Sequence, residues 1–222
     1  STTFDVDEGI QALARSLRDW PDRVRFVLAD VLESKHALSE SFLDALGAPS
    51  PGGGRTLLVS NLPYSIATPI LLGLLALDAP PERIVAMIQR EVAEKMFATP
   101  ADRNYGVPSI HVGLKAEGRI LRRFGPGVFW PRPKVDSAVI ELRPEPGRLA
   151  ADEQREFAAF VTALFTRRRK VLPTALAHAA SLPVSEARAL VGALGLAPTA
   201  RVQELEPEGV LRVFRAVGEA TV

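Results

Sequence analysis

The corner between an apolar strand and an apolar helix constrains the fold of this chain most strongly. Residues 56–59 form a short apolar run typical of a buried strand, and residues 70–77 form a longer run typical of a helix packed against it. Four residues stand at the corner between them: Asn61, Leu62, Pro63 and Tyr64. Pro63 forces the residue before it into an extended conformation. The corner therefore lies at the carboxyl end of a strand, which is the edge where open α/β sheets bind ligands.

The chemistry that suits this corner is methylation of a planar amino group. The amide oxygen of Asn61 and the carbonyl oxygen of Leu62 can accept the two hydrogens of an exocyclic amino group, which leaves the nitrogen lone pair free for an electrophilic methyl. The ring of Tyr64 can stack on a base that has left its own stack. The alternative is a purely structural corner, in which Asn61 caps the helix and Tyr64 fills space. The corner by itself leaves both interpretations open.

Composition limits the classes of protein to which this chain can belong. Its 222 residues are 47% hydrophobic, as in a globular chain of one large domain or two unequal ones. The net charge is +1, so a nucleic-acid surface has to come from local clusters of cations. Because the chain has no cysteine and only three scattered histidines, we expect no disulfide, thiol catalysis or metal site. No apolar run reaches the roughly 18 residues of a transmembrane helix and no secretory leader opens the chain, so we expect a cytoplasmic protein without a membrane partner.

An acidic residue ends the first predicted strand. Residues 1–7 have the pattern of a strand that leads into a helix. One face of that helix is apolar: Ile10, Leu13, Ala14 and Leu17. At the tip of such a strand, the carboxylate of Asp5 can hold the ribose hydroxyls of a nucleoside cofactor. The alternative is that Asp5 or Asp7 caps the helix.

A second acidic residue follows the next predicted strand, residues 24–29. The carboxylate of Asp30 can accept a hydrogen bond from the adenine amino group of a nucleoside cofactor, although Asp at a strand end is also common in turns. Because Asp5, Asp30 and Asn61 each close a strand, we expect all three to line one crevice. The glycine-rich run at 52–54 precedes a strand and lacks the Lys-Ser/Thr pair of a phosphate loop, so we predict a linker there.

A loop between two further predicted strands, residues 118–124 and 137–142, combines aromatic and basic side chains. Loops with such content on a rigid scaffold usually contact a ligand. We expect Phe129 to face a bound base from the side opposite Tyr64, and the alternative is that Phe129 or Trp130 is buried in the core. The loop also supplies two candidate RNA contacts, Arg132 and Lys134.

From Asp152 onward the pattern is helical only, which predicts a small all-helical domain over residues 147–222 after an α/β domain over residues 1–146. The first helix has an apolar face of five residues: Phe157, Phe160, Val161, Leu164 and Phe165. It ends in a run of four cations: Arg167, Arg168, Arg169 and Lys170. Neighbouring cations can neutralise several phosphates, and the alternative is that they complement the helix dipole. Two further helices are predicted at 184–194 and 207–217.

Five specific stretches occur in a fixed order along nearly the whole chain. They are Phe4-Asp5-Val6-Asp7; Ala29-Asp30-Val31; Asn61-Leu62-Pro63-Tyr64 with Thr68-Pro69; Gln89-Arg90-Glu91-Val92-Ala93 with Tyr105-Gly106; and Phe129-x-Pro131-x-Pro133-Lys134-Val135-Asp136-Ser137, followed by Arg168-Arg169-Lys170. With these stretches the chain resembles the small-subunit ribosomal RNA adenine dimethyltransferase family. The Asn-Leu-Pro-Tyr and Phe-x-Pro-x-Pro-Lys-Val-Asp-Ser pieces are highly specific.

The resemblance implies a Rossmann-like class I methyltransferase fold, in which an α/β sheet is followed by a small helical domain. Members of the family use S-adenosyl-L-methionine to dimethylate N6 of adjacent adenosines in small-subunit ribosomal RNA, and so take part in maturation of the 30S-type subunit precursor. Methyl transfer is an in-line displacement that depends on positioning, without a metal or a covalent intermediate. We expect the protein to act as a monomer.

The same resemblance implies roles for individual residues. The cofactor would be held at its ribose by Asp5 and Val6, at its adenine by Asp30 and Val31, and also by Asn61. The target adenine would be received by Asn61, Leu62, Pro63 and Tyr64, with Phe129 opposite. The RNA contacts would be Arg132, Lys134, Arg167, Arg168, Arg169 and Lys170.

Two departures from the family pattern bear on these expectations. Asp5 stands where the family has Glu, which shortens the ribose contact by one methylene. The chain also begins at the family's second strand, so we expect the sheet to lack the central first strand, which pairs with strands two and four, and the Gly-rich turn after it. An inert RNA-binding or assembly factor in this 222-residue form is the alternative that the second departure supports. A separate alternative is a large-subunit rRNA or DNA adenine N6-methyltransferase.

Overall fold

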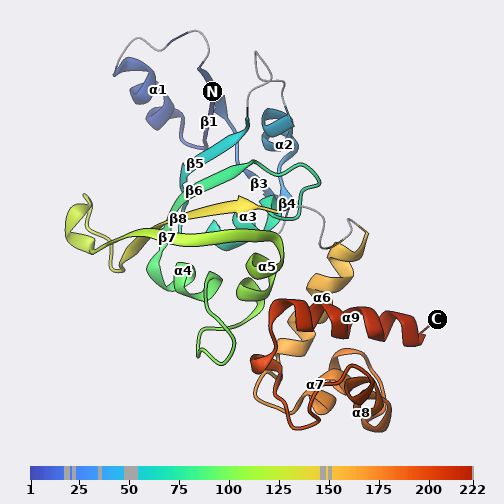
Figure 1. Ribbon diagram of the computed structural model, residues 1–222. Helices are drawn as coiled ribbons and strands as arrows, with labels where there is room; N and C mark the ends of the chain where they lie inside the picture. The colour runs from blue at the N-terminus through green and yellow to red at the C-terminus, as the bar shows by residue number, and fades with distance from the viewer. Residues whose placement is uncertain are drawn as a thin grey trace.

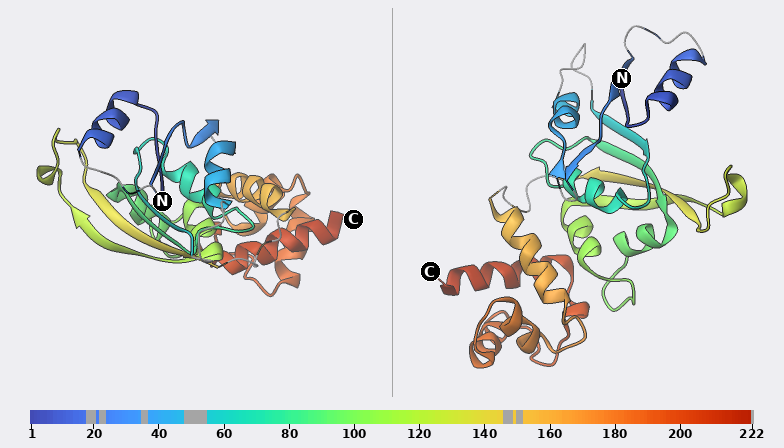
Figure 2. Two further views of the ribbon diagram at one scale, coloured as in Figure 1. Left: turned by 90° about the horizontal axis from the view of Figure 1, so that it is seen from above. Right: turned by 180° about the vertical axis from the view of Figure 1, so that it is seen from behind.

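The computed structural model contains a layered α/β part followed by a group of helices (Figures 1 and 2). The structure describes residues 1–17, 21, 24–34, 37–47, 55–145, 149 and 152–221. Two sequence predictions fall outside the described residues: the linker at 52–54 and the boundary between residues 146 and 147. No helix in the described ranges is both long and apolar enough to cross a membrane.

A four-stranded mixed sheet forms the centre of the α/β part (Figure 1). Its strands run in the order β5 (Leu57–Asn61), β6 (Arg83–Gln89), β8 (Ser137–Pro144) and β7 (Ala116–Phe124). β5 and β6 are parallel, and β8 is antiparallel to both of its neighbours. A parallel pair requires a crossover, which α3 (Ala67–Leu74) supplies between β5 and β6. The carboxyl ends of β5 and β6 therefore lie at the same edge of the sheet.

One face of this sheet is buried under three helices. The alternate β6 residues Ile84, Ala86 and Ile88 are buried on this face, as the period of two in a strand dictates. α3, α4 (Arg90–Met96) and α5 (Val107–Lys115) pack against it. Each large apolar side chain that is fully buried in this way stabilises the fold by roughly 1.5–3 kcal/mol. The corner between β5 and α3 is therefore supported by a well-packed hydrophobic core.

A separate parallel pair, β1 (Thr2–Asp5) and β2 (Arg25–Leu28), precedes the central sheet. α1 (Glu8–Ser16) connects the two strands, so the predicted strand–helix–strand order is confirmed. Asp5 pairs in register with Leu28, which brings the carboxyl ends of both strands to one edge.

A short hairpin and a helix, which the sequence did not predict, follow β2. The hairpin consists of β3 (Leu32–Ser34) and β4 (Ala37–Leu38), and α2 (Glu40–Gly47) comes directly after it. The strands of the hairpin are too short for a visible alternation of apolar and polar residues. The ring of Phe42 in α2 is buried and meets the ring of Phe4 edge-on, with the centroids 5.3 Å apart. This contact ties α2 to β1.

An open gap separates β1 from β5. Among the described residues β1 pairs only with β2 and β5 only with β6, and a cavity of about 510 Å³ lies between residues 1–4 and residues 55–60. Leu57 and Val59 of β5 are 59% and 77% exposed, whereas a strand of a parallel sheet is ordinarily covered on both faces. The gap lies between the two strands that the family resemblance placed on either side of a further strand.

The apolar face of α1 is exposed as well. Ile10, Leu13 and Leu17 have the predicted helical spacing, yet more than half of each side chain is exposed. The residue that α1 buries is Gln11, whose side-chain amide donates a hydrogen bond to the carbonyl of Val27 in β2 (2.5 Å). The helix was predicted correctly, but the apolar face identified by the spacing is not the face that α1 buries.

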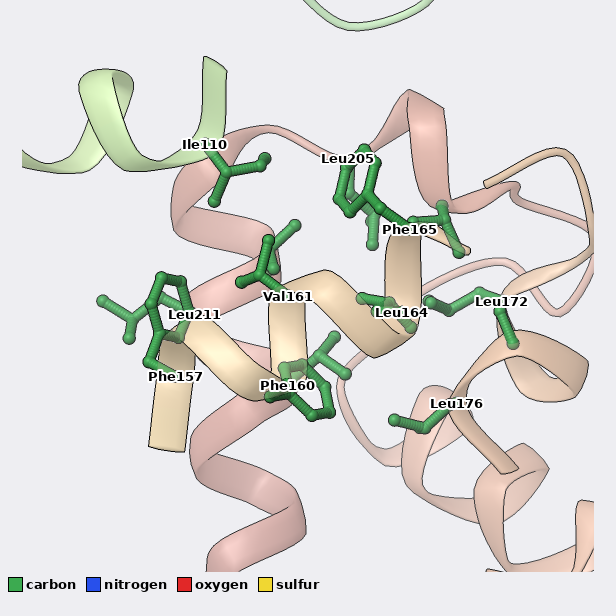
Figure 3. Close-up of a cluster of buried hydrophobic side chains, with 14 of the residues drawn as sticks. Ile110, Phe157, Phe160, Val161, Leu164, Phe165, Leu172, Leu176, Leu205 and Leu211 are labelled. Carbon is green, nitrogen blue, oxygen red and sulfur yellow. The ribbon is translucent and has the colours of Figure 1, made fainter. Parts of the chain in front are cut away.

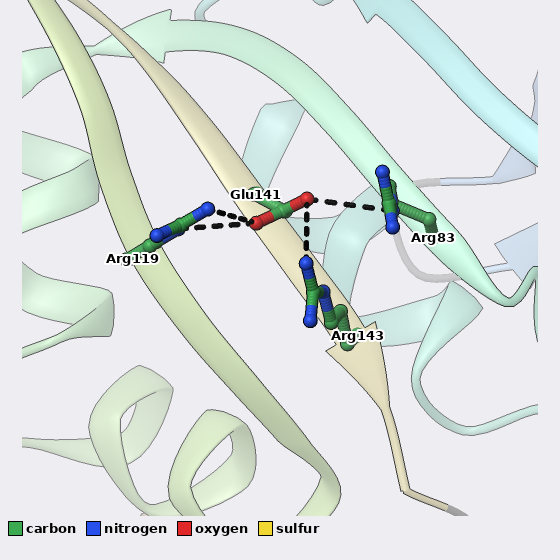
Figure 4. Close-up of polar contacts among 4 residues, drawn as sticks. All are labelled: Arg83, Arg119, Glu141 and Arg143. Atoms are coloured by element: carbon green, nitrogen blue, oxygen red, sulfur yellow. Dashed lines mark hydrogen bonds and ion pairs between the residues drawn. The ribbon is translucent and has the colours of Figure 1, made fainter.

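On the side of the sheet opposite α3, one buried carboxylate gathers three arginines (Figure 4). Glu141 of β8 contacts Arg83 of β6 (3.4 Å), Arg119 of β7 (3.1 Å) and Arg143 of β8 (3.5 Å). Burial raises the pKa of Glu141, but the three arginines outweigh burial and hold this pKa below its usual value. The carboxylate thus stays charged and links three strands across their exposed face.

The C-terminal helices pack around a core of their own (Figure 3). They are α6 (Glu153–Phe165), α7 (Leu172–Ala179), α8 (Val184–Ala193) and α9 (Pro207–Thr221). The apolar face predicted for α6 is confirmed, since all five of its residues are buried. The helices predicted at 184–194 and 207–217 correspond to α8 and α9. The sequence did not predict α7, which carries a proline in its first turn.

α5 joins this helical core to the sheet layer. Its Val112 packs beneath the sheet, whereas Ile110 and Leu114 belong to the core of the C-terminal helices. The division into domains 1–146 and 147–222 therefore stays a prediction, because a helix of the first segment completes the core of the second.

His111 of α5 is a buried histidine beside α6, and it generates a testable dependence of stability on pH. Its ring meets Phe157 edge-on at 5.7 Å, and burial together with Lys115 lowers the pKa of His111 from 6.5 to about 4. Between these two pH values the unfolded chain binds a proton that the folded chain excludes. We expect the free energy of unfolding to fall by on the order of 2–3 kcal/mol through this residue as the pH falls across that interval.

The measurement is urea unfolding of the protein and of His111→Asn at several pH values between about 4.5 and 7. His111→Asn should lose this part of the pH dependence, whereas His178→Asn, at an exposed position of α7, should keep it. An equally steep pH dependence in His111→Asn would contradict the assignment.

Candidate active site

The end of β5 turns a polar side chain outward and an apolar one inward. The backbone N–H of Leu62 donates to the carbonyl of Met87 (3.1 Å), and the Leu62 side chain is buried. The N–H of Ile66 donates to the carbonyl of Pro63 (3.1 Å), which closes the turn into α3. α3 has Ile66 as its N-cap and no side-chain capping bond. The alternative that Asn61 caps this helix is therefore wrong, and the exposed Asn61 amide remains available to a ligand.

A cavity of about 360 Å³ joins this corner to the loop between β7 and β8. Its lining consists of the four corner residues, Met87 of β6, and four residues of the loop: Phe129, Trp130, Pro131 and Pro133. The volume lies in the range of ~300–1,000 Å³ that is typical of small-ligand sites. The predicted meeting of Asn61 and Tyr64 with Phe129 is thus present in the structure, across more than sixty residues of sequence.

Tyr64 is held by the first residue of β8. Its hydroxyl lies 2.7 Å from the hydroxyl of Ser137, which is fully buried. The hydrogen bond fixes the polar end of the tyrosine, so that its half-buried ring forms a wall of the cavity. Tyr64 therefore does more than fill space at the corner.

The loop between β7 and β8 is anchored at both ends. Near its start, Phe129 meets the ring of Phe124 edge-on at 6.4 Å. At its end, the carboxylate of Asp136 forms an ion pair with the guanidinium of Arg90 (2.5 Å). The backbone carbonyl of Asp136 also accepts a hydrogen bond from the backbone N–H of Arg90 (2.9 Å). Between these anchors the Trp130–Pro131 peptide bond is cis. Trp130 is 96% exposed, so its predicted alternative as a core residue is wrong, and Phe129 is half-buried.

The two acidic strand ends lie together at the edge of β1 and β2. Asp5 accepts the N–H of Asp7 (2.8 Å), while Asp7 is the residue that caps α1 by accepting from Ile10 (3.0 Å). Asp30 accepts the N–H of Leu32 (2.9 Å). Neither Asp5 nor Asp30 lines the cavity that contains Asn61. The structure thus brings the ends of the two strands together, but it does not place Asp5 and Asp30 with Asn61 in that cavity.

The two valines that follow these carboxylates have different surroundings. Val6 is 68% exposed beside Asp5, whereas Val31 is half-buried and lines the gap between β1 and β5.

Among the described residues, no group of three or more metal-ligating side chains comes together.

The basic run after α6 divides into two kinds of residue. Arg168 is half-buried, and its guanidinium donates to the carbonyls of Arg103 (3.2 Å) and Tyr105 (3.1 Å). Three cations of the run are exposed: Arg167, Arg169 and Lys170. The loop cations Arg132 and Lys134 are exposed as well. The structure therefore assigns Arg168 a role in holding the chain before α5, which the run of like charges did not reveal.

The sequence alone did not identify two residues that position parts of the site. Ser137 and Arg90 occur in the stretches that carry the family resemblance, but nothing in a linear sequence connects Ser137 with Tyr64 or Arg90 with Asp136. The structure supplies both connections.

Comparisons with known proteins agree with this geometry. The model of the family described as ribosomal RNA adenine dimethylase matches residues 14–218. The chain belongs to this family. The predicted family is therefore confirmed.

Relatives from several organisms are similar to nearly the whole chain. A protein of Streptomyces griseus named ribosomal RNA small subunit methyltransferase A is 38% identical over 98% of this chain and 79% of its own length. A probable ribosomal RNA small subunit methyltransferase A of Thermococcus gammatolerans is 40% identical over 96% of this chain and 77% of its own. The relative from Streptomyces coelicolor is 42% identical over 73% of this chain, and the matched part spans only 57% of that relative.

Two solved structures share the fold. A dimethyladenosine transferase from Plasmodium falciparum superimposes with a TM-score of 0.76 at 20% identity, over 100% of this chain and 82% of its own. The 23S rRNA methyltransferase ErmE superimposes with a TM-score of 0.60 at 23% identity, over 98% and 81%. The predicted α/β methyltransferase fold is confirmed.

The hydrogen bond between Tyr64 and Ser137 can be tested without a substrate. Ser137→Ala and Tyr64→Phe should each lower the free energy of unfolding by about 1 kcal/mol, because each removes the hydrogen bond and leaves the other hydroxyl without this partner. The double variant should lose less than the sum of the two, with a coupling of about 0.5–1.5 kcal/mol in a urea-unfolding cycle. Additive losses would show that the two hydroxyls do not interact in solution.

Proposed function

We propose that this protein is an S-adenosyl-L-methionine-dependent adenine N6-dimethyltransferase that acts on small-subunit ribosomal RNA. The observation that carries the proposal is the cavity in which the exposed Asn61 amide lies beside the Tyr64 ring and the half-buried Phe129. Membership of the ribosomal RNA adenine dimethylase family and the names of the relatives support the same reaction.

The corner at the end of β5 provides acceptors for an amino group. The amide oxygen of Asn61 and the carbonyl of Leu62 accept the two hydrogens of the adenine amino group, which directs the nitrogen lone pair away from both acceptors. Tyr64 and Phe129 hold the flipped base by its two faces. Since the anchored loop and the Ser137 hydroxyl fix these groups in advance, little reorganisation is needed when the base arrives.

The residues at the ends of β1 and β2 fit the nucleoside part of the cofactor by their chemistry. Asp5 uses one carboxylate oxygen, Oδ1, for the N–H of Asp7, and the described residues give Oδ2 no partner. Asp30 likewise commits Oδ1 to Leu32. The remaining oxygens are suited to ribose hydroxyls and to the adenine amino group, with Val6 and Val31 alongside. When bound, S-adenosyl-L-methionine supplies an electrophilic methyl group.

The exposed cations are suited to the RNA backbone. Arg132 and Lys134 lie in the loop that lines the cavity, and the run after α6 presents Arg167, Arg169 and Lys170. Arg168 belongs to the same run, although its guanidinium is already bound to two carbonyls. A small-subunit precursor offers phosphates to the five exposed cations.

One observation favours a second candidate, an RNA-binding assembly factor that transfers no methyl group. The gap between β1 and β5 separates Asp5 and Asp30 from the cavity that contains Asn61. If the cofactor fails to bind across this gap, the basic surfaces still bind RNA.

The proposal is tested by the transfer of radiolabelled methyl groups to unmodified small ribosomal subunits. Asn61→Ala should lower transfer by about 10²-fold or more, because it removes an acceptor at the reacting nitrogen. Its affinity for the RNA should stay within about threefold of that of the parent, since the phosphate contacts remain. Asn104→Ala, in the turn before α5, is the matched control and should leave both quantities unchanged.

Each outcome of this experiment separates the candidates. Absence of transfer by the parent, with cofactor binding confirmed by calorimetry, would overturn the enzymatic proposal. Absence of cofactor binding with intact RNA binding would favour the assembly factor. Faster transfer to large-subunit RNA or to DNA in competition would reassign the substrate.

The exposed basic run generates a prediction about salt dependence. Replacing Arg167, Arg169 and Lys170 by Ala should weaken RNA binding and reduce the slope of log K against log salt by about 2, because each lost phosphate contact removes roughly 0.7–0.9. Fluorescence anisotropy of labelled RNA at several salt concentrations measures the slope. Arg55→Ala, at a surface cation paired with Glu82, is the control. An unchanged slope in the triple variant would show that the run serves only its helix end.

A further inference from the structure

Trp130 is an exposed aromatic side chain on an anchored loop. It is 96% exposed, the highest value among the exposed large apolar residues of the described chain. The connection that carries it projects from the sheet beyond β7 and β8 (Figures 1 and 2). Several of the other exposed apolar side chains belong to α1 or to the strand beside the gap, such as Leu57 and Val59. Trp130 lies apart from both, so the open sheet does not explain its exposure.

The loop presents the indole firmly. Phe129 packs on Phe124, and Asp136 is bound by Arg90 through both its side chain and its carbonyl. Two prolines, Pro131 and Pro133, fix backbone angles directly after the tryptophan. Because the backbone on either side of Trp130 is held in this way, a partner that binds the indole has to order the side chain alone and not the loop, which favours binding.

Trp130 also stands at the rim of the cavity that contains Asn61 and Tyr64. The rings of Tyr64 and Phe129 already line that cavity, so the indole is available for a second planar group just outside it. Cations accompany it: Arg132 and Lys134 are exposed in the same loop, and the guanidinium of Arg122 lies over the Phe124 ring at 5.1 Å. The one carboxylate of the loop, Asp136, is paired with Arg90.

We infer that Trp130 stacks on the unpaired base next to the target adenine, with Arg132 and Lys134 on the phosphates that flank it. An aromatic face among cations is the chemistry that recognises single-stranded nucleic acid without regard to base identity. Among the described residues no acidic side chain pairs with Arg132 or Lys134, so both cations are open to phosphates, and the observations favour RNA. This inference rests on the proposed function, since it assumes that the cavity receives a base of the same strand.

The direct test is the fluorescence of Trp130. The chain has two tryptophans, Trp20 and Trp130, so Trp20→Phe leaves Trp130 as the only indole. The probe is a single-stranded oligoribonucleotide with two adjacent adenosines, and a fully paired duplex of the same sequence is the comparison. Stacking should quench the emission of Trp130 in step with binding of the single strand. Unchanged emission at saturation, with binding confirmed by anisotropy of the labelled RNA, would overturn the inference.

Three variants separate stacking from general apolar contact. Trp130→Ala should weaken binding of the single strand about 5- to 150-fold, the range that corresponds to loss of one stacked base. Trp130→Phe keeps a planar ring and should stay within about threefold of the parent. Val128→Ala, at an exposed apolar residue of the same loop, should have no effect. Equal losses in Trp130→Ala and Val128→Ala, or none in either, would contradict stacking.

The outcomes distinguish this inference from the proposed function. Quenching and the Trp130→Ala loss without any methyl transfer would leave the stacking role intact and remove the enzymatic one. Normal methyl transfer with neither quenching nor loss would remove the stacking role alone. Quenching that rises with protein concentration in the absence of RNA would identify a second copy of the chain as the partner, and would overturn the inference.

Discussion

Parallel pairing of β5 with β6 is the interaction on which the candidate site depends. It sets Asn61 opposite Met87 and delivers the next N–H, that of Leu62, to the Met87 carbonyl. Pro63 has no N–H to continue the ladder, so the chain has to leave the sheet there. The buried Leu62 side chain fixes the direction of this exit. The exit of the backbone at Pro63 therefore places Asn61 and Tyr64 at this edge of the sheet.

The second half of the site depends on β8, which pairs with β6 from the other side. Ser137 pairs in register with Gln89, and its hydroxyl reaches Tyr64. Asp136, one residue earlier, is bound by Arg90 at the start of α4. The same strand therefore positions the tyrosine and ends the aromatic loop. The register of the sheet thus brings Tyr64 and Ser137, which are far apart in sequence, within hydrogen-bonding distance of each other.

Local patterns predicted much of this arrangement. The corner at Pro63 and the apolar face of α6 depend on neighbouring residues, and both are present in the structure. The pairing of Arg168 with two carbonyls before α5 depends on a contact more than sixty residues away, so a run of four cations gave no sign of it. The spacing of Ile10 and Leu13 predicted an amphipathic helix, but burial also requires a neighbouring element, and no element of the described part of the chain covers that face of α1. The meeting of Phe129 and Tyr64 was predicted from the aromatic and basic content of the loop, and the family resemblance implied it as well.

α5 has a mechanical consequence for the molecule. Val112 on one side of this helix belongs to the core under the sheet, and Ile110 and Leu114 on the other side belong to the core of the C-terminal helices. Rotation of those helices away from the sheet would therefore separate the apolar side chains of one of these cores. The span from the exposed cations after α6 to the cavity below Trp130 is consequently fixed by packing. For the proposed RNA substrate, this fixed span would set the distance between the nucleotide in the cavity and the phosphates bound by the exposed cations.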